Sequence, residues 1–449
     1  MAARPSRRIV NVQSHPWRAW QLFAERFAFF VVCAFACAAQ APAPAFAAQV
    51  HHAKHAESRH ANKAAARHRA SAPLRAVVPH DGEAEARLIA VYRLIGQANV
   101  REALRQAEAL VRDHPNFQLA QLVYGDLLMA HAKPVRTLGD VPDAAARLAG
   151  QSLTDLREES LLRMRALRER PPPGAIPLQF VQLSAANHHA IAVDTSRARL
   201  YLFENTGTGL KLIGDYYISV GKLGIEKSTE GDLRTPLGVY YVTTNLDPKT
   251  LKDFYGAGAL PINYPNPYDM RQGRTGSGIW LHGTPPTQYS RAPKATDGCI
   301  VLANPDLLRI IRTVELRTTP VVITKNIRWV SPQAVEYDAR RFNEVLQAWR
   351  SAKASGDVAR ILGFYESGFS GNGKTLAEWR PVLTGELERI RGHDLQLKDV
   401  SLLRWTDSAD TMVVTFSEAA AGSRVASIRR QYWMRLGAQW KIFFEGVIG

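Results

Sequence analysis

The run Pro171-Pro172-Pro173-Gly174 separates two regions of different periodicity. Three consecutive prolines cannot continue a helix, because proline lacks an amide donor and its ring clashes with the preceding turn. Before this run, apolar residues recur every three or four positions, as in amphipathic helices. After Pro177 they form short runs punctuated by glycine, as in strands. The chain must therefore fold as a helical region followed by a β-rich one.

The helical pattern begins near Glu83 and occupies two apolar stretches, over residues 88–95 and 103–111. The second stretch is followed by Pro115 and then by Gly125, and this spacing resembles a tetratricopeptide (TPR) repeat. Pro134 interrupts the next unit. A stable array needs about three repeats. We therefore expect residues 83–170 to form a short TPR-like helical region rather than a peptide-binding array.

Residues 1–47 have the features of a secretory signal peptide. Arginines precede the apolar run over residues 27–39, and Ala45-Phe46-Ala47 provides a small-x-small cleavage pattern. A helix of this length spans about 20 Å, less than a hydrocarbon core of about 30 Å. We expect export to the periplasm or cell envelope with cleavage after Ala47; an uncleaved anchor is the alternative. Residues 48–82, rich in Ala, His, Lys and Arg, are predicted to be a disordered basic linker.

The net charge and the number of cysteines limit which partners and which chemistry we expect. The net charge of +16 is spread along all 449 residues, which favours contact with an anionic polymer or a membrane surface over a nucleic-acid module. No nucleic-acid partner is expected. Of the three cysteines, Cys33 and Cys37 lie in the predicted signal peptide. Cys299 is then the only thiol of the mature chain, which excludes a disulfide framework.

Residues 178–326 contain the motifs that carry chemistry. They are Glu230 to Tyr240, a turn-rich stretch, then Gly278-Ile279-Trp280-Leu281-His282-Gly283-Thr284, and Ala295-Thr296-Asp297-Gly298-Cys299-Ile300. This combination resembles the L,D-transpeptidase catalytic domain of the YkuD type, whose HG and (Ser/Thr)-x-Gly-Cys motifs fall on His282-Gly283 and on Thr296 to Cys299. The resemblance implies a mainly-β domain that attacks peptidoglycan stem peptides between an L-centred diamino acid at position three and D-alanine at position four.

The residue types agree with thiol acyl transfer. The thiol of a free cysteine has a pKa of about 8.5, so little of it is thiolate at neutral pH unless a neighbouring group takes its proton or lowers this pKa. His282 is the nearest histidine in sequence to Cys299 within this region and is the predicted base. Gly298 allows a tight turn, and the amides of Gly298 and Cys299 are candidate oxyanion donors. This chemistry needs no metal or organic cofactor.

The remaining site predictions concern the loop and the substrate. Thr296, Asp297, Gly298 and Gly283 are assigned to the oxyanion loop, and Lys222, Arg234 and Trp280 to substrate binding. Asp297 stands where the family often has histidine, which leaves the third catalytic group open; a backbone carbonyl is one candidate for polarising His282. Val301 stands where the family often has arginine. These departures are compatible with a hydrolytic branch.

Beyond Val330 the pattern returns to helices and then to strands. Helical stretches are expected after Val335, over residues 358–365 and over residues 376–390, followed by strands near residues 395–403, 411–416, 425–436 and 440–447. This order resembles the cone-like fold of nuclear transport factor two (NTF2) relatives, here over residues 335–449. The aromatic residues of this part are expected in its core: Trp379, Trp405, Tyr432, Trp433 and Trp440.

The predicted fold class is therefore multidomain: a short α-helical TPR-like region, a mainly-β catalytic domain and an α+β cone-like domain. This architecture also resembles cell-shape L,D-carboxypeptidases. Three functions stay open: an L,D-transpeptidase, an L,D-carboxypeptidase, and a non-catalytic murein-binding scaffold. The expected partner is the peptidoglycan stem peptide, with the helical or the C-terminal domain available for a protein partner; the oligomeric state is left open.

Overall fold

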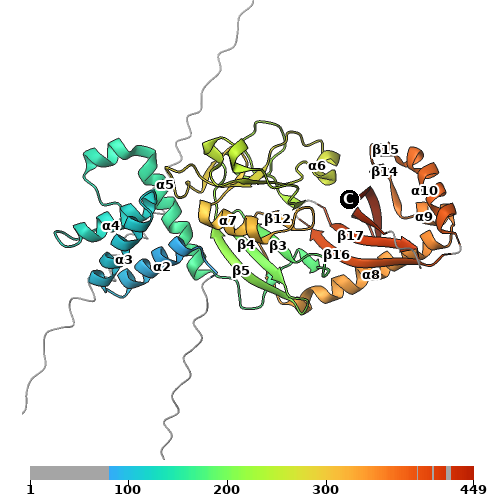
Figure 1. Ribbon diagram of the computed structural model, residues 1–449, viewed down its shortest axis with the longest axis horizontal. Coiled ribbons are helices and arrows are strands. Elements are labelled where there is room, and N and C mark those ends of the chain that lie inside the picture. The colour runs from blue at the N-terminus through green and yellow to red at the C-terminus, as the bar shows by residue number, and fades with distance from the viewer. Residues whose placement is uncertain (1–79, 392, 407–408, 421–425, 449) are drawn as a thin grey trace, which may run out of the picture. The chain divides into compact units, whose positions relative to one another are not determined.

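The computed structural model describes residues 80–391, 393–406, 409–420 and 426–448 (Figure 1). The predicted signal peptide and nearly all of the predicted linker lie outside these residues, as do Cys33 and Cys37. In this part of the chain, helices come first, then a β-rich region, then helices followed by long strands, which confirms the predicted fold class. No described helix is both long enough and apolar enough to cross a membrane.

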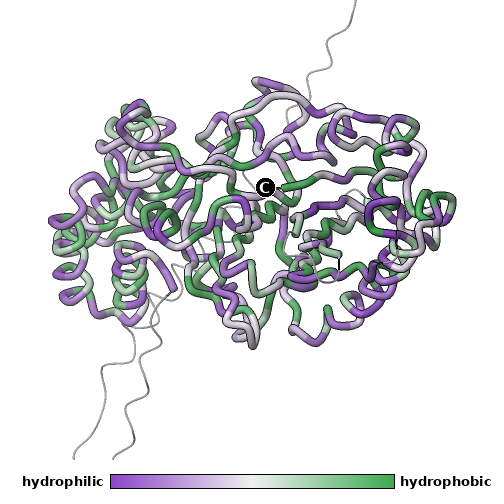
Figure 2. The backbone as a smooth tube through the Cα atoms, turned by 45° about the vertical axis from the view of Figure 1, so that its right-hand side comes forward, coloured by the Kyte–Doolittle hydropathy of each residue, from purple (hydrophilic) through white to green (hydrophobic). Residues whose placement is uncertain are grey.

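The helical region consists of four helices: α2 (Glu83–Gly96), α3 (Val100–Asp113), α4 (Gln118–Met129) and α5 (Asp143–Arg168). Hydrophilic and hydrophobic residues alternate along these helices, as Figure 2 shows. Their apolar sides share one core, which contains Leu88, Leu110 and Phe117. The same core includes Tyr289 and Ala303 from the β-rich region. The core of the helical region is therefore completed by side chains of the β-rich region.

The main sheet of the β-rich region has the strand order β5-β4-β3-β12-β7. Its strands are β3 (His189–Asp194), β4 (Arg199–Asn205), β5 (Leu210–Tyr217), β7 (Gly238–Tyr241) and β12 (Pro320–Thr324). The central strands β3 and β12 are parallel and read as continuous apolar runs, because both faces of the sheet are covered. Helix α7 (Asn304–Thr313) contributes Leu307 and Ile310 to the same core.

One strand begins earlier than the sequence predicts. The apolar run Tyr216-Tyr217-Ile218-Ser219-Val220 predicts a strand over residues 216–220, whereas β5 covers Leu210–Tyr217. The apolar pattern marks only the buried end of β5, because the first half lies at the sheet edge and is partly exposed. Residues 220–221 belong instead to the short strand β6 (Val220–Gly221), which pairs with β10 (Lys294–Thr296).

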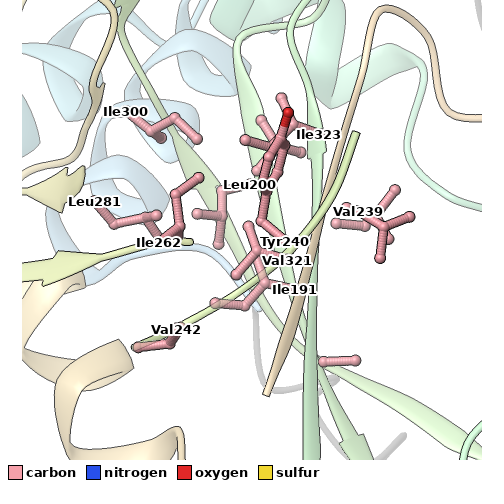
Figure 3. Packing of buried hydrophobic residues seen from close by; sticks show 14 of the residues in the cluster. Ile191, Leu200, Val239, Tyr240, Val242, Ile262, Leu281, Ile300, Val321 and Ile323 are labelled. Atoms are coloured by element: carbon pink, nitrogen blue, oxygen red, sulfur yellow. The ribbon is translucent and has the colours of Figure 1, made fainter. Parts of the chain in front are cut away.

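Three further short strands place the sequence motifs beside the main core. They are β8 (Ala259–Pro261), β9 (Trp280–His282) and β11 (Ile300–Val301), in the order β11-β9-β8. Strands β9 and β11 run parallel, with Leu281 opposite Ile300. Both of these side chains point into the hydrophobic core in Figure 3 and are fully buried. The remaining short elements of this region are β1 (Ile176–Pro177), paired with β13 (Trp329–Val330), two 3-10 turns (Pro248–Thr250 and Asp253–Tyr255) and α6 (Pro267–Arg271).

The C-terminal domain packs helices against a seven-stranded sheet. Its helices are α8 (Pro332–Ala354), α9 (Val358–Leu362) and α10 (Leu376–Ile390), and α8 runs beside β16 in Figure 1. The strand order is β15-β14-β19-β18-β17-β16-β2. The strands are β2 (Phe180–Gln182), β14 (Tyr365–Gly371), β15 (Lys374–Thr375), β16 (Leu395–Trp405), β17 (Thr411–Ala420), β18 (Ser427–Leu436) and β19 (Gln439–Val447).

Two features of this domain differ from the sequence-based expectation. The helix expected over residues 358–365 stops at Leu362, because Gly363 caps it and Tyr365 already pairs in β14. Strand β2 precedes the catalytic motifs in sequence, yet it pairs with β16 at the edge of the C-terminal sheet. Of the aromatic residues expected in the core of this domain, Trp379 and Trp433 are buried in it, and Trp440 packs against it from a partly buried position. Trp405 and Tyr432 are buried instead in the cluster that includes the main sheet of the catalytic domain.

The C-terminal domain contains a buried ion cluster. The Lys353 ammonium lies 2.7 Å from a carboxylate oxygen of Glu418 and 3.1 Å from one of Glu386. The Arg429 guanidinium lies 3.0 Å from each of these carboxylates and 2.6 Å from that of Glu445. Charges removed from water need such partners, because an unpaired buried charge is strongly unfavourable.

Candidate active site

Cys299 and His282 project from the same face of neighbouring strands. Cys299 directly precedes β11, and His282 ends β9. In the register of these strands, Ile300 lies opposite Leu281 and both point into the core. Because successive side chains of a strand point to opposite faces, the residues next to this core pair point away from it. The predicted nucleophile and the predicted base are thus directed to one side of the sheet.

The thiol of Cys299 is held by the backbone of the neighbouring strand. Its Sγ lies 3.4 Å from the carbonyl oxygen of Gly278, to which it donates, and it accepts a hydrogen bond from the amide of Trp280. Burial raises the pKa of the thiol to about 11, and the Trp280 amide and the cations Arg291 and Lys227 oppose this shift. The resting group at neutral pH is therefore the protonated thiol.

The imidazole of His282 is almost fully enclosed, with 1% of the residue exposed. Its Nδ1 lies 2.8 Å from the carbonyl oxygen of Gly283. A carbonyl can only accept, so this contact assigns the proton to Nδ1 and leaves the lone pair on Nε2. The rings of Phe254 and Tyr255 lie 5.9 Å and 5.0 Å from the imidazole, centroid to centroid.

The environment of His282 keeps it neutral. Burial, together with the charge of Arg291, lowers its pKa to about 4, against the opposing effect of the hydrogen bond to the Gly283 carbonyl. At neutral pH the imidazole is thus an unprotonated base, directed to the same side of the sheet as the protonated thiol. Such a pair can transfer a proton when the sulfur attacks a substrate, without a preformed ion pair.

The turn before Cys299 requires glycine at position 298. Gly298 has a φ of +124°, and a Cβ there would lie 2.6 Å from the carbonyl oxygen of Arg234. The hydroxyl of Thr235 donates to the Gly298 carbonyl at 2.9 Å. The Thr296 hydroxyl accepts from the Gly298 amide at 3.1 Å and donates to the Cys299 carbonyl at 2.7 Å. These contacts fix the loop that presents the thiol.

The loop contacts bear on the two candidate oxyanion donors. The Gly298 amide is engaged by Thr296, so it does not point freely toward a substrate. The Gly283 amide donates to the carbonyl of Tyr255 at 3.0 Å. The Cys299 amide is therefore the better candidate of the two amides that the sequence suggested.

The other residues predicted to bind substrate surround this loop. Lys222 and Asp297 form an ion pair of 2.9 Å, and both side chains are more than half exposed. The guanidinium of Arg234 is turned to the carbonyl oxygen of Ile225, 2.9 Å away. The ring of Trp280 lies 4.9 Å from that of Tyr255. Lys222 and Arg234 thus already have partners within the protein.

Sequence reasoning missed three residues of the site: Phe254, Tyr255 and Arg291. The two aromatic rings pack on His282, and Arg291 interacts electrostatically with both His282 and Cys299. Phe254 and Tyr255 lie far from both motifs in sequence and carry no recognisable pattern. One sequence feature could have indicated Arg291: it is one of only two cationic residues between Thr284 and Gly298. Within the described residues, no group of three or more His, Cys, Asp or Glu side chains is placed to hold a metal ion.

Comparisons with known proteins agree with this architecture. The family described as L,D-transpeptidase catalytic domain (YkuD) matches residues 188–323, a stretch that contains both His282 and Cys299. The family described as Cds6 C-terminal NTF2-like domain matches residues 341–446. A search of curated proteins found no match.

Two of the solved structures that are similar to this chain come from Bdellovibrio bacteriovorus and Campylobacter jejuni. The structure of Bdellovibrio bacteriovorus Bd1075 is 25% identical, with a TM-score of 0.52, and the match covers 61% of this chain and 98% of that one. The helical cell shape determining protein Pgp2 from Campylobacter jejuni is 22% identical, with a TM-score of 0.48, and the match covers 60% of this chain and 95% of that one. The family matches show that the chain carries a YkuD-type L,D-transpeptidase catalytic domain followed by an NTF2-like domain; sequence motifs predicted the first, and the order of helices and strands predicted the second.

Proposed function

We propose that this protein is a peptidoglycan-modifying cysteine acyltransferase. It cleaves the bond between the L-centred diamino acid at position three and the D-alanine at position four of stem tetrapeptides. The observation that carries the proposal is the placement of the Cys299 thiol and the His282 imidazole on one face of adjacent strands in the YkuD domain. The neutral state of the imidazole supports a role as general base.

The first step forms an acyl-enzyme. The sulfur of Cys299 attacks the carbonyl carbon of residue three, and its proton moves to Nε2 of His282. The tetrahedral oxyanion is stabilised by a backbone amide, for which Cys299 is the candidate. When the carbon–nitrogen bond breaks, the imidazolium returns the proton to the departing amine of D-alanine. A thioester between Cys299 and the tripeptide remains, and His282 is neutral again.

The acceptor decides the product of the second step. An amine of another stem peptide attacks the thioester, forms a new amide and releases the thiol, which is the L,D-transpeptidase reaction. His282 takes the proton of the incoming amine and returns it to the sulfur. This transfer to an amine is the first candidate, because the matched catalytic domain is described as an L,D-transpeptidase.

The second candidate is an L,D-carboxypeptidase, in which water attacks the thioester and a tripeptide is released. The observation that favours it is the NTF2-like domain behind the catalytic domain. The sequence resembles cell-shape L,D-carboxypeptidases in this pairing. Either reaction takes place on the cell wall, in agreement with the predicted export of the chain.

Product analysis tests the proposal. The mature chain is incubated with purified tetrapeptide muropeptides, and the products are separated and weighed by mass spectrometry. Cross-linked dimers identify the transpeptidase, and tripeptide monomers with free D-alanine identify the carboxypeptidase. The Cys299→Ala variant is the matched control and must yield neither. Binding of murein with no turnover by the unchanged chain would instead identify a scaffold and contradict the proposal.

A further inference from the structure

The loop over residues 284–293 links the helical region to the active site. The ring of Tyr289 stacks on that of Phe117 at 4.4 Å between centroids, and the imidazole of His114 meets it edge-on at 5.3 Å. The Tyr289 amide donates to the carbonyl of Asn116 at 3.0 Å, and the Asn116 side chain donates to the carbonyl of Pro286 at 3.0 Å. The turn between α3 and α4 therefore holds this loop from one side.

Helix α5 holds the next residue of the loop. The hydroxyl of Ser290 donates to a carboxylate oxygen of Glu159 at 2.8 Å. Glu159 is buried and is itself paired with the buried Arg163 at 2.8 Å. The contact is thus enclosed and fixed at both ends, unlike a surface ion pair, which contributes little.

The catalytic domain holds the same loop from the other side. The hydroxyl of Tyr217 donates to the carbonyl of Arg291 at 2.9 Å, and that of Ser219 donates to the carbonyl of Ala292 at 2.5 Å. The backbone on both sides of the Arg291 side chain is therefore clamped between the helical region and the main sheet. This arrangement restricts where the guanidinium of Arg291 can lie.

The guanidinium of Arg291 lies beside the base. Its central carbon is 4.1 Å from the ring centroid of Phe254, and it donates to the Phe254 carbonyl at 3.3 Å. The ring of Phe254 in turn packs on the imidazole of His282. The half-buried cation, the aromatic ring and the base thus form one continuous set of contacts at the nucleophile.

Unlike the neighbouring cations, Arg291 forms no ion pair with a carboxylate among the residues that the structure describes. Lys227 is paired with Asp232 at 2.9 Å, and Lys222 with Asp297 at 2.9 Å. The carboxylate of Asp297 acts on the Arg291 guanidinium through its charge, while its ion pair is made with Lys222. Burial lowers the pKa of Arg291, against the opposing effects of Cys299 and Asp297. A half-buried arginine of this kind is poised to take an anion from a ligand, because its planar fork matches a carboxylate.

We propose that Arg291 binds the terminal carboxylate of the D-alanine leaving group and that the helical region positions Arg291 through the 284–293 loop. The inference rests on the proposed function, since the substrate supplies the carboxylate. That carboxylate belongs to the residue whose amine departs, so it lies within one residue of the carbon that Cys299 attacks. Arg291 is then a specificity-determining residue, and Tyr289 is a positioning residue that acts through it.

Binding to the inactive protein tests the role of Arg291. The Cys299→Ala variant is titrated with a stem tetrapeptide that ends in D-alanine and with the same peptide ending in the carboxamide. We expect the acid to bind at least about tenfold more tightly than the amide. Adding Arg291→Gln should abolish this preference, and adding Arg291→Lys should keep only part of it, because lysine lacks the fork. An unchanged preference in the Arg291→Gln variant, or no preference in Cys299→Ala itself, would overturn the inference.

Substitutions at Tyr289 test the positioning role. Tyr289→Ala in the Cys299→Ala background should lower the acid preference several-fold and leave amide binding unchanged, whereas Tyr289→Phe keeps the stacking and should keep the preference. Leu127→Ala is the matched control: it removes a buried side chain of the same helical core, about 15 Å along α4 from Phe117. Equal loss of preference in Tyr289→Ala and Leu127→Ala would show a general structural effect and contradict positioning.

The two proposals fail in different ways. Turnover of tetrapeptide by the unchanged chain tests the proposed function, whereas the acid preference of the Cys299→Ala variant tests Arg291. A protein that prefers the acid through Arg291 and does not cleave it would contradict the function and support the anion site.

Discussion

The Nδ1 atom of His282 lies 2.8 Å from the carbonyl oxygen of Gly283, its neighbour in the chain. This contact supplies what a third catalytic side chain would supply: it fixes the tautomer and leaves Nε2 as the base. Asp297, which the sequence left open as a third group, is exposed and paired with Lys222 instead. The proposed catalytic groups are therefore two side chains and one backbone carbonyl.

The buried pair predicts an unusually wide pH range of activity. The reactive form has a neutral imidazole and a protonated thiol. Burial lowers the pKa of His282 to about 4 and raises that of Cys299 to about 11. Falling pH protonates His282 and removes the base, so kcat/KM should stay flat from about pH 5 to about pH 9 and decline only near pH 4. A pH–rate profile and an NMR titration of His282 check this. An acid limb near pH 6.5, the ordinary histidine value, would contradict it.

Removing the base should cost activity without unfolding the domain. His282→Ala should lower kcat by about 10²- to 10⁴-fold, the usual contribution of a positioned general base. His189→Ala is the matched control, because His189 lies in the same domain and is paired with Glu315 at 2.9 Å. Steady-state kinetics with tetrapeptide should separate the two variants. Equal activities of the two variants would exclude His282 as the base.

Gly298 should be irreplaceable for two combined reasons. An alanine Cβ would lie 2.6 Å from the Arg234 carbonyl, and the φ of +124° disfavours any side chain. Gly298→Ala should therefore displace the thiol and lower kcat by at least about tenfold, the cost of a small misplacement of a reacting group. Gly273→Ala is the comparison, because Gly273 also has a positive φ but no atom within 4 Å of its added Cβ. If both variants keep full kcat, the close approach is not needed.

The ion cluster of the C-terminal domain should be sensitive to loss of one partner. Lys353→Met keeps the apolar stem but leaves Glu418 and Glu386 with fewer counter-charges, and should lower the free energy of unfolding by about 3–5 kcal/mol. Lys374→Met, at an exposed position of the same domain, should change it little. Denaturant unfolding of both variants measures the difference. A stability of Lys353→Met within error of Lys374→Met would show that the cluster is not stabilising.

The sequence predicted what depends on local pattern. The change of period at Pro171-Pro172-Pro173-Gly174 and the helix Leu376–Ile390 follow from spacing alone. The fold class and the domain resemblance were confirmed by the family matches. The nucleophile and the base were found from two short motifs because both lie close together in the chain, and their roles stay a prediction.

What depends on distant contacts could not be predicted. Strand β2 joins β16 more than 200 residues later, and pairing across such a separation leaves no local signal. Arg291 enters the site because Asn116, Phe117 and Glu159 of the helical region hold its loop. The engagement of the Gly298 amide by Thr296 likewise follows from the loop geometry and not from the motif.

Trapping the acyl-enzyme tests the central claim most directly. The mature chain is mixed with a stem tetrapeptide, quenched in acid within the first turnover, and weighed intact before peptide mapping. The account predicts a mass increase equal to the tetrapeptide minus D-alanine, located on Cys299 and absent from Cys299→Ala. Release of D-alanine by the Cys299→Ala variant at an undiminished rate, with no adduct on the unchanged chain, would contradict it.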